Sequence, residues 1–173
     1  MSAGAGRPRI SAGIVLFRRI DGPLEVLLAH PGGPFFVRKD EGHWTIPKGE
    51  VDDGEVDDDA GLLVVARREF AEETGHPAPA GDGLNLGSVV QKGGKVVHAW
   101  AFEGELDPTM AKSNTFEIAW PPGSGRRTIF PEIDRVAWFE PVEARRRIKP
   151  SQIPLLDRLE ELLRSGDVAS TLS

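Results

Sequence analysis

Arg67-Arg68-Glu69-Phe70-Ala71-Glu72-Glu73-Thr74-Gly75 is the most informative stretch of this chain. If the run is helical, Glu69, Glu72 and Glu73 occupy positions i, i+3 and i+4 and lie on one face. Three carboxylates gathered in this way repel one another, and divalent cations placed among them would make the arrangement favourable. Hard oxygen ligands suit Mg²⁺ or Mn²⁺. A solvated acidic helix face is the alternative, and this run alone does not decide between the two.

A second segment lies upstream and reads Trp44-Thr45-Ile46-Pro47-Lys48-Gly49-Glu50-Val51-Asp52-Asp53-Gly54-Glu55. Together the two segments resemble the Nudix box, G-x5-E-x7-R-E-U-x-E-E-x-G-U, in which U is a bulky aliphatic residue. Gly49 and Glu55 match its opening half. The closing half is matched by Arg68, Glu69, Phe70, Glu72, Glu73 and Gly75.

The chain departs from this pattern in two places. Gly49 and Gly75 lie 26 positions apart (75 − 49), about five more than the pattern allows, most simply because residues 56–60 are inserted. His76 also replaces the final aliphatic residue. The insertion can lengthen the loop, or start the helix earlier, without moving the carboxylates. The alternative is that residues 52–59 form an additional acidic cation site.

The sequence predicts a helix over residues 60–74. Asp57, Asp58 and Asp59 suit its N-terminus as capping residues and by their interaction with the helix dipole. Gly75 suits its C-terminal stop, with Pro77 just beyond. The apolar stripe at helical spacing consists of Leu62, Leu63, Ala66 and Phe70.

The rest of the chain alternates strand-like and helical patterns. Strands are expected at residues 10–17, 24–29, 84–91, 96–106 and 133–139, with a short apolar run at 116–120, a loop at 121–127, and helices at 141–148 and 154–163. The resemblance implies an α/β (α+β) fold, a Nudix-type mixed β-sheet sandwiched between helices. We expect one domain over residues 10–164 with flexible tails at 1–9 and 165–173.

Composition limits the classes of function. The chain has 173 residues, of which 39% are hydrophobic and 28% charged, as expected for a globular domain. The net charge of −6 argues against broad nucleic-acid binding. Absence of cysteine excludes disulfides and thiolate metal sites. No apolar run approaches a membrane span and no signal peptide is visible, so a cytoplasmic location is the default expectation.

The resemblance to Nudix hydrolases implies that a metal-activated water attacks the pyrophosphate of a nucleoside diphosphate linked to another group. Glu69 and Glu73 are then the best metal-ligand candidates, and Glu72 is a further ligand or proton acceptor. The backbone carbonyl of Gly49 commonly completes the metal shell in this family. Arg68 and Glu55 are expected to orient the helix and loop through an ion pair. The general base stays open.

A carboxylate from outside the box often joins such a site. The segment 130–139 resembles the late strand of RNA 5′-pyrophosphohydrolases and dinucleoside polyphosphate hydrolases, where a Pro-Glu pair precedes an aromatic strand. Glu132 is therefore the candidate, with Glu103 and Glu117 as rivals.

Substrate preference rests on fewer residues. Pro47-Lys48-Gly49 resembles the dinucleoside polyphosphate and diphosphoinositol subgroups, and Lys48 could pair with a phosphate. The pairs Lys92 with Lys95, and Arg126 with Arg127, could hold a longer phosphate chain. With no tyrosine present, the candidates for stacking on a base are Phe35, Phe36, Trp44 and Trp100, whereas Trp120 and Trp138 are expected in the core.

These patterns predict a Mg²⁺-dependent pyrophosphohydrolase, with Mn²⁺ as a possible substitute, that cleaves dinucleoside polyphosphates such as diadenosine tetraphosphate. The alternatives are a nucleoside triphosphate or RNA 5′-end pyrophosphohydrolase, and a catalytically silent nucleotide-binding module. The expected partner is a nucleotide-type small molecule rather than a membrane or a nucleic acid, and the oligomeric state is open.

Overall fold

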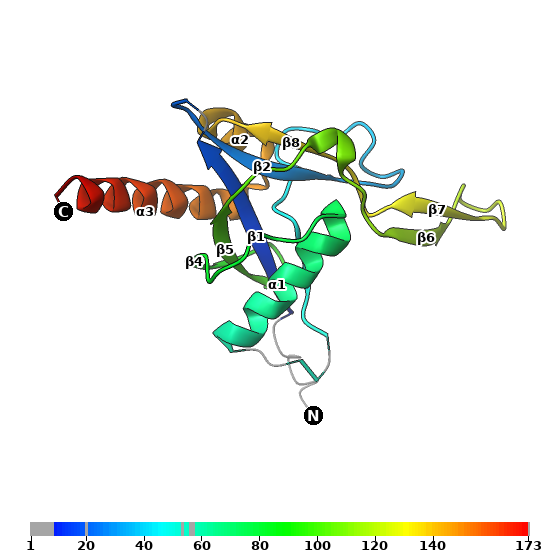
Figure 1. The fold of residues 1–173 in the computed structure, drawn as a ribbon. Helices are drawn as coiled ribbons and strands as arrows, with labels where there is room; N and C mark the ends of the chain where they lie inside the picture. Colours follow the sequence, from blue (N-terminus) through cyan, green and yellow to red (C-terminus); the bar gives the residue numbers. More distant parts are fainter. Residues whose placement is uncertain (1–8, 20, 53, 56–57, 173) are drawn as a thin grey trace.

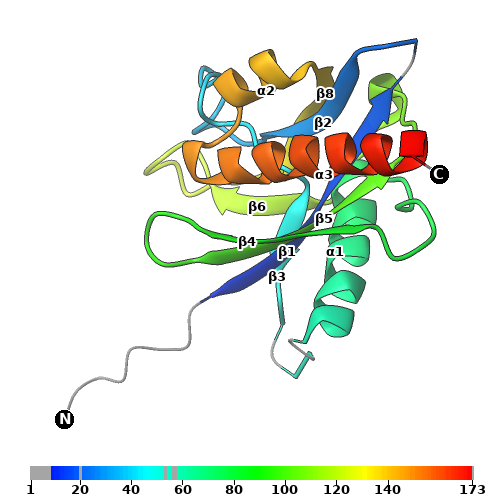
Figure 2. The same cartoon turned by 90° about the vertical axis from the view of Figure 1, so that its left-hand side faces the viewer.

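A mixed six-stranded sheet forms the centre of the protein, with strand order β4-β5-β1-β2-β8 and β3 paired to β1. The computed structural model describes residues 9–172, apart from residues 20, 53, 56 and 57 and the side chains of 167–172. Helix α1 covers one face of the sheet, and α2 and α3 cover the other (Figures 1 and 2). The predicted sandwich of a mixed sheet between helices is confirmed. The strands of this sheet are β1 (Ile10–Arg19), β2 (Leu24–Pro31), β3 (Lys48–Glu50), β4 (Leu84–Val90), β5 (Val96–Glu103) and β8 (Ile133–Phe139).

Strand β1 shows how the sequence builds two cores. Its side chains alternate between the two faces, as they do in any strand. Ile14 and Leu16 join the cluster that packs against α1, whereas Val15 and Phe17 join the cluster beneath α2 and α3. Because both faces are covered, β1 is apolar at consecutive positions rather than alternating with polar residues.

Helix α1 (Asp59–Thr74) begins and ends at the predicted signals. The side chain of Asp58 accepts a hydrogen bond from the N–H of Gly61 at 2.8 Å, which caps the first turn. Gly75 follows with φ of 75°, in the left-handed region where glycine is favoured, and its N–H donates to the carbonyl of Ala71. Within the proposed insertion, Asp58 to Ala60 therefore cap and start α1, whereas Val56 and Asp57 lie outside the described residues.

The opposite layer consists of α2 (Pro141–Arg147), a short 3₁₀ turn η2 (Pro150–Gln152) and α3 (Ile153–Leu172). The helix end predicted at residue 163 is wrong, because α3 continues to Leu172. The division into a domain at 10–164 and two tails stays a prediction. No helix formed by the described residues has the length and apolar character needed to cross a membrane.

A two-stranded hairpin, β6 (Thr115–Ala119) and β7 (Arg127–Pro131), extends away from the sheet (Figure 1). A second 3₁₀ turn, η1 (Pro108–Met110), precedes it. Sequence patterns did not reveal β3 or β7. Strand β3 has three residues and one of them is glycine, and only Arg127, the first residue of β7, had been assigned, to the end of a loop. Both strands are short, and pairing with β1 or β6 rather than local propensity makes them extended.

Candidate active site

Two glutamates of α1 lie against β3. The carboxylate of Glu73 accepts a hydrogen bond from the backbone N–H of Lys48 at 3.1 Å, and its side chain is 9% exposed. Glu69, one turn earlier, lies against Gly49 so closely that a Cβ at that position would be 2.0 Å from its Oε2. The absence of a side chain at Gly49 is therefore a requirement of close packing between β3 and the Glu69 carboxylate.

Arg68 ties the loop before α1 to the carboxylates, as the sequence predicted. One guanidinium nitrogen donates to Glu55 Oε2 at 2.7 Å, and another donates to Glu69 Oε1 at 3.1 Å. Glu72 lies 4.0 Å from Arg68 Nε and keeps 41% of its side chain exposed. The Glu55 pair raises the pKa of Arg68 further above its ordinary value, so this guanidinium is a permanent positive charge between the loop and the helix.

Burial dominates the electrostatics of the two inner carboxylates. It raises the pKa of Glu73 to about 8, although the N–H and ammonium of Lys48 act in the opposite direction. It also raises the pKa of Glu69, against the hydrogen bond from Arg68. Charge on Glu132 adds to both shifts. The side chains of Glu69, Glu73 and Glu132 are therefore close enough to repel one another, which is the property expected of carboxylates that share a cation.

Glu132 owes this position to a chain of backbone hydrogen bonds. The N–H of Asn114 donates to the carbonyl of Glu72, and the N–H of Glu132 donates to the carbonyl of Asn114, each at 2.8 Å. The residue before β8 is thereby fixed beside the end of α1. The two rival acids are engaged elsewhere, since Glu103 pairs with Arg19 and Glu117 with Arg127.

The donor set suits a hard divalent cation, because it consists of carboxylate oxygens, and Glu69 among them lies directly against the backbone of Gly49. The arrangement is not closed around a single point, however. Among the described residues, no group of three or more acidic or histidine side chains is gathered tightly enough to enclose a metal ion as it stands. Glu69 and Glu73 instead bond to Arg68 and to the Lys48 N–H.

Lys48 belongs to a group of cations on the other face of β3. A Cβ added to Gly13, which is paired with Lys48, would meet the Lys48 Cβ at 2.7 Å, so the lysine side chain leaves β3 on the α2 and α3 side, where Val15 also packs. Burial, and then the charges of Lys95 and Lys149, lower the pKa of Lys48 to about 8. Lys48 and Glu73 each favour the charged form of the other, but in both cases burial is the larger effect.

The aromatic residues differ from the expected division. Trp44 is 3% exposed and donates from its indole N–H to Asp40, and Trp100 is 4% exposed, so neither presents a free face to a base. Trp138, expected in the core, is partly buried and packs against the core cluster on the α1 side, whereas Trp120 is partly exposed and lies outside both clusters. Phe35 is 63% exposed and makes an edge contact with Trp120, with 5.5 Å between ring centroids.

Arg126, proposed as a substrate contact, is exposed in the loop joining β6 and β7. The whole length of β7 separates it from Glu132, at the end of the hairpin that extends away from the sheet (Figure 1). The structure does not bring Arg126 together with the carboxylates.

His30 was not identified from the sequence. Its side chain is fully buried, with Nδ1 at 2.9 Å from Asp134 Oδ1 and Nε2 at 2.5 Å from the carbonyl oxygen of Lys39. His30 thereby joins the 32–43 loop to β8. A histidine inside an apolar strand was the only sequence signal for this role.

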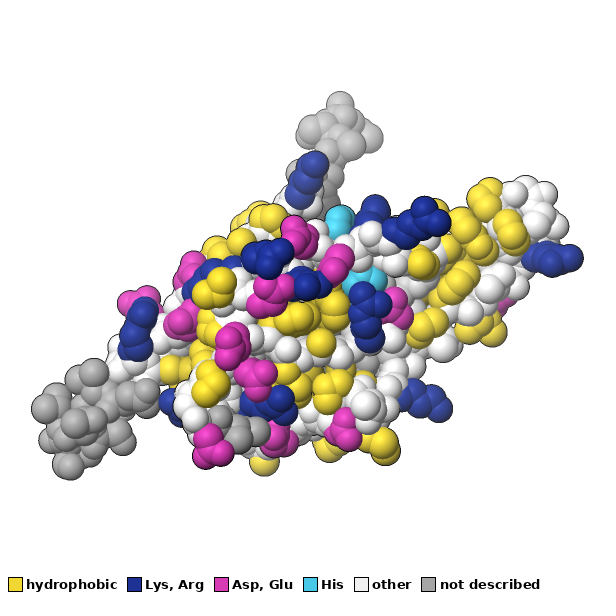
Figure 3. Space-filling view, turned by 90° about the horizontal axis from the view of Figure 1, so that it is seen from above, with side chains coloured by type: hydrophobic (Ala, Val, Ile, Leu, Met, Phe, Trp, Pro, Cys, Tyr) yellow, Lys and Arg dark blue, Asp and Glu magenta, His cyan; other side chains and the backbone are white. Residues whose placement is uncertain are grey.

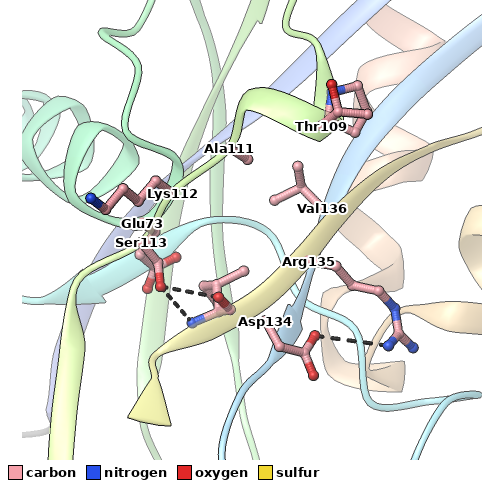
Figure 4. Close-up of a pocket in the computed structure, with 10 residues that line it drawn as sticks. Glu73, Thr109, Ala111, Lys112, Ser113, Asp134, Arg135 and Val136 are labelled. Atoms are coloured by element: carbon pink, nitrogen blue, oxygen red, sulfur yellow. Dashed lines mark hydrogen bonds and ion pairs between the residues drawn. The ribbon is translucent and has the colours of Figure 1, made fainter. Parts of the chain in front are cut away.

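A polar pocket of about 210 Å³ opens beside Glu73 (Figure 4). Lys112 and Ser113 lie on the same side as Glu73, while Thr109 and Val136 lie across from them. The Ser113 hydroxyl bonds both backbone groups of Ile133, at 3.0 and 3.1 Å. The pocket gives Glu73 a polar neighbourhood, and the serine fixes the start of β8 next to Glu132.

Comparison with known proteins agrees with the fold. A sequence model described as the NUDIX domain matches residues 7–159. An Ap4A hydrolase from C. elegans, solved as a binary complex, is similar in fold, with a TM-score of 0.63 and 22% identity over 90% of this chain and 98% of that one. The NUDIX domain of Shewanella oneidensis NrtR, complexed with ADP ribose, gives a TM-score of 0.59 and 20% identity over 91% and 89%. A MutT protein from Methanosarcina mazei Go1 gives 0.54 and 20% over 90% and 96%.

Proposed function

The chain belongs to the Nudix family of pyrophosphohydrolases, and we propose that it hydrolyses dinucleoside polyphosphates such as diadenosine tetraphosphate, with Mg²⁺ or Mn²⁺ as its metal. Nudix hydrolases generally use divalent metal ions, and the acid cluster of this chain is of the matching chemistry. The cytoplasmic location stays a prediction.

One observation carries the proposal. Glu69 and Glu73 are held against β3 on one side, while Lys48 of the same strand projects a cation on the other side. Carboxylates for a metal ion and a cation for phosphate are thus separated by the width of a single strand. A pyrophosphate needs both kinds of group, because its non-bridging oxygens carry negative charge and its bridging oxygen gains charge as the bond breaks.

Each residue then has a defined part. Glu69 and Glu73, joined by Glu132 and with Glu72 as a further candidate, would hold the cation, and the Gly49 carbonyl is an additional ligand candidate from β3. When bound, the cation supplies Lewis-acid polarisation of phosphate oxygens and lowers the pKa of a bound water. Arg68 keeps Glu69 and the Glu55 loop in register.

The choice among substrates rests on charge. Burial lowers the pKa values of Lys48 and Lys149, and the charge of Lys95 lowers both further. A longer phosphate chain supplies more negative charge to relieve this repulsion than the two phosphates of ADP-ribose do. The similarity in fold to an Ap4A hydrolase is compatible with this choice. Acidic and basic side chains are interspersed on the face shown in Figure 3, so that face offers no continuous basic track for RNA.

The test is a hydrolysis panel at fixed Mg²⁺ and salt, with dinucleoside tri-, tetra- and pentaphosphates, nucleoside triphosphates, ADP-ribose, and capped or triphosphorylated RNA. We expect the highest kcat/KM for the tetraphosphate or pentaphosphate, and loss of turnover with EDTA. Preference for ADP-ribose, a triphosphate or RNA would reject the substrate assignment while leaving the metal chemistry in place.

A nucleotide-binding module without turnover is the second candidate. The observation in its favour is that Glu73 bonds the Lys48 N–H and that the described carboxylates do not enclose a common point. Absence of hydrolysis on every member of the panel, together with Mg²⁺-independent nucleotide binding by calorimetry, would establish this alternative.

A further inference from the structure

The loop that follows β2 displays apolar side chains to solvent. Phe35 is 63% exposed and Val37 is 68% exposed. Neither belongs to the two core clusters that the described residues form. Large apolar side chains exposed close together mark a surface that meets a ligand or a partner more often than scattered ones do. This segment takes no part in the carboxylate site.

Contacts on both sides hold the exposed segment in place. Before it, the N–H of Gly32 donates to the carbonyl of Glu132 at 2.8 Å. After it, the carboxylate of Asp40 accepts from the indole N–H of Trp44 at 2.7 Å and from the guanidinium of Arg147 at 2.5 Å. The apolar side chains are therefore displayed on an anchored backbone, which reduces the entropy that would be lost when a ligand binds.

The β6–β7 hairpin supplies a second apolar surface next to this loop. Its register pairs Phe116 with Phe130, and the centroids of the two rings are 6.1 Å apart. Partly buried positions alternate with exposed ones along β6, so Phe116, Ile118 and Trp120 share one face of the hairpin. The loop lies on that face, because a Cβ added to Gly33 would be 2.8 Å from the Phe116 ring. Loop and hairpin are thus packed together as one unit.

Phe35 and Trp120 meet near the turn of the hairpin. Their ring centroids are 5.5 Å apart and their planes form an angle of 79°. Trp120 is itself partly exposed. Two rings at nearly a right angle form a corner, which we call the aromatic corner, in which a third flat ring can stack on one ring and meet the edge of the other. Flat aromatic ligands gain most from this geometry.

Positive charge accompanies the aromatic corner. Four exposed cations lie in the loop and in the turn of the hairpin, namely Arg38, Lys39, Arg126 and Arg127. Glu117 is the only acid between residues 115 and 131, and it pairs with Arg127 at 2.9 Å. The arm on the right in Figure 3 is this hairpin, and it shows hydrophobic side chains with Lys and Arg beside them. A flat ring joined to negative charge, as in a nucleotide, is complementary to both features.

Both halves of this unit lead to Glu132. Strand β7 ends at Pro131, directly before it, and the loop begins at Gly32, which bonds its carbonyl. Because β7 has five residues, it is about 17 Å long. A nucleoside attached through several phosphates is of comparable length, so a ligand that starts at the carboxylates can reach the aromatic corner.

We propose that Phe35 and Trp120 bind the nucleobase of one of the two nucleosides of the substrate, the one that extends past Glu132 along the hairpin. The cations of the loop and of the hairpin turn attract the phosphates attached to it. This assignment rests on the proposed function for its substrate, and it makes the aromatic corner a determinant of specificity for substrates that carry a nucleoside at each end.

Binding without turnover tests the aromatic corner directly. A diadenosine tetraphosphate analogue with methylene groups in place of the bridging oxygens is titrated calorimetrically, with Mg²⁺, into the full-length protein. The variants are Phe35→Ala, Phe35→Trp and the control Val142→Ala, which changes a side chain 77% exposed on α2. We expect Phe35→Ala to weaken binding by about fivefold or more, and the other two to bind within about twofold of wild type. Because Phe35 is largely exposed, all three variants should melt as wild type does.

Two results of this titration would overturn the proposal. One is binding of the analogue by Phe35→Ala within about twofold of wild type. The other is an equal weakening of methylenediphosphonate, which carries negative charge but no base, because the effect would then not depend on stacking.

Kinetics relate the aromatic corner to turnover. On diadenosine tetraphosphate, Phe35→Ala should raise KM with little change in kcat, because stacking far from the reacting phosphorus is equally strong in the ground and transition states. A fall in kcat at unchanged KM would show a structural effect on the carboxylates and would contradict base binding. If wild type hydrolyses no dinucleoside polyphosphate and yet Phe35→Ala binds the analogue more weakly, the proposed function fails and the base site stands.

Other occupants of the aromatic corner would give different results. If a single-stranded oligoadenylate binds wild type more tightly than the analogue does, and Phe35→Ala loses that binding, the surface serves RNA and the assignment to a substrate nucleoside is wrong. If sedimentation shows a wild-type dimer that Phe35→Ala converts to monomers, a second copy of the chain covers the surface, and the assignment is wrong as well.

Discussion

Glu73→Gln should make the metal-free protein more stable and the enzyme nearly inactive. The reason is the position of this carboxylate, 9% exposed and next to Glu69 and Glu132. Its pKa is raised from 4.5 to about 8. Between these two values the folded state binds more protons than the unfolded state, so stability falls as pH rises through this window. Glutamine has the same shape and does not titrate.

The magnitude follows from the width of the window. Each pH unit within it changes the free energy of unfolding by about 1.4 kcal/mol per such group. From pH 5.5 to 7.5 wild type should therefore lose about 2–3 kcal/mol through Glu73, corresponding to roughly 5–10 °C in Tm for a chain of this length. Glu69 contributes with the same sign to both proteins and largely cancels in the comparison. Lys48, with a pKa lowered to about 8, acts with the opposite sign and above this window.

The assay is urea unfolding in EDTA at pH 5.5 and 7.5, for wild type, Glu73→Gln and the control Glu72→Gln. The control removes a carboxylate from the same helix whose side chain is 41% exposed, so it should keep the wild-type pH dependence. With Mg²⁺, turnover of Glu73→Gln should fall by about 100-fold or more, because the substitution changes a metal ligand itself rather than a residue that hydrogen-bonds to a ligand. Identical pH dependence in wild type and Glu73→Gln would refute the electrostatic argument, and near-wild-type turnover would refute the ligand assignment.

Three further substitutions probe the supports of the site. Gly49→Ala should place a Cβ against Glu69 and displace that flexible carboxylate. We therefore expect kcat/KM to fall by about tenfold or more while the melting temperature changes little. Unchanged kinetics would show that the close approach of Gly49 to Glu69 is incidental. Asp58→Ala removes the cap of α1 and should lower the free energy of unfolding in urea by about 1 kcal/mol without altering turnover. A large loss of turnover would instead favour the alternative that residues 52–59 form an acidic cation site. His30→Leu leaves Asp134 and the Lys39 carbonyl without their partner and should lower stability by about 1–3 kcal/mol; a melting temperature equal to that of wild type would contradict the bridging role.

The sequence was a good guide where the structure depends on local signals. Asp58 and Gly75 mark the ends of α1 because capping requires only neighbouring backbone groups. The pairing of Arg68 with Glu55 was predicted from the box and is present at 2.7 Å, despite the longer segment between them. The predicted bounds of β8, residues 133–139, also agree with the structure.

Features set by long-range contacts were not visible in the sequence. Lys48 to Glu50 is a strand because it pairs with β1. Burial of Trp44 and exposure of Trp120 depend on which layer covers each ring. His30 gains its role from Asp134, 104 positions away. Glu69, Glu72 and Glu73 were found because they lie on one helix.

Strand β3 explains how metal-binding and anion-binding groups can lie so close without neutralising one another. Successive side chains of a strand point to opposite faces. Gly49 therefore faces α1 and its carboxylates, while Lys48 and Glu50 face the lysines of the other side. A shift of pairing by one residue would bring the Lys48 side chain onto the Glu69 carboxylate and remove the space that Gly49 provides. The register of three residues against Ser11, Ala12 and Gly13 thus determines both halves of the proposed site. It follows that a residue inserted between Pro47 and Gly49 should be far more damaging to turnover than the longer segment before α1 that this chain already carries.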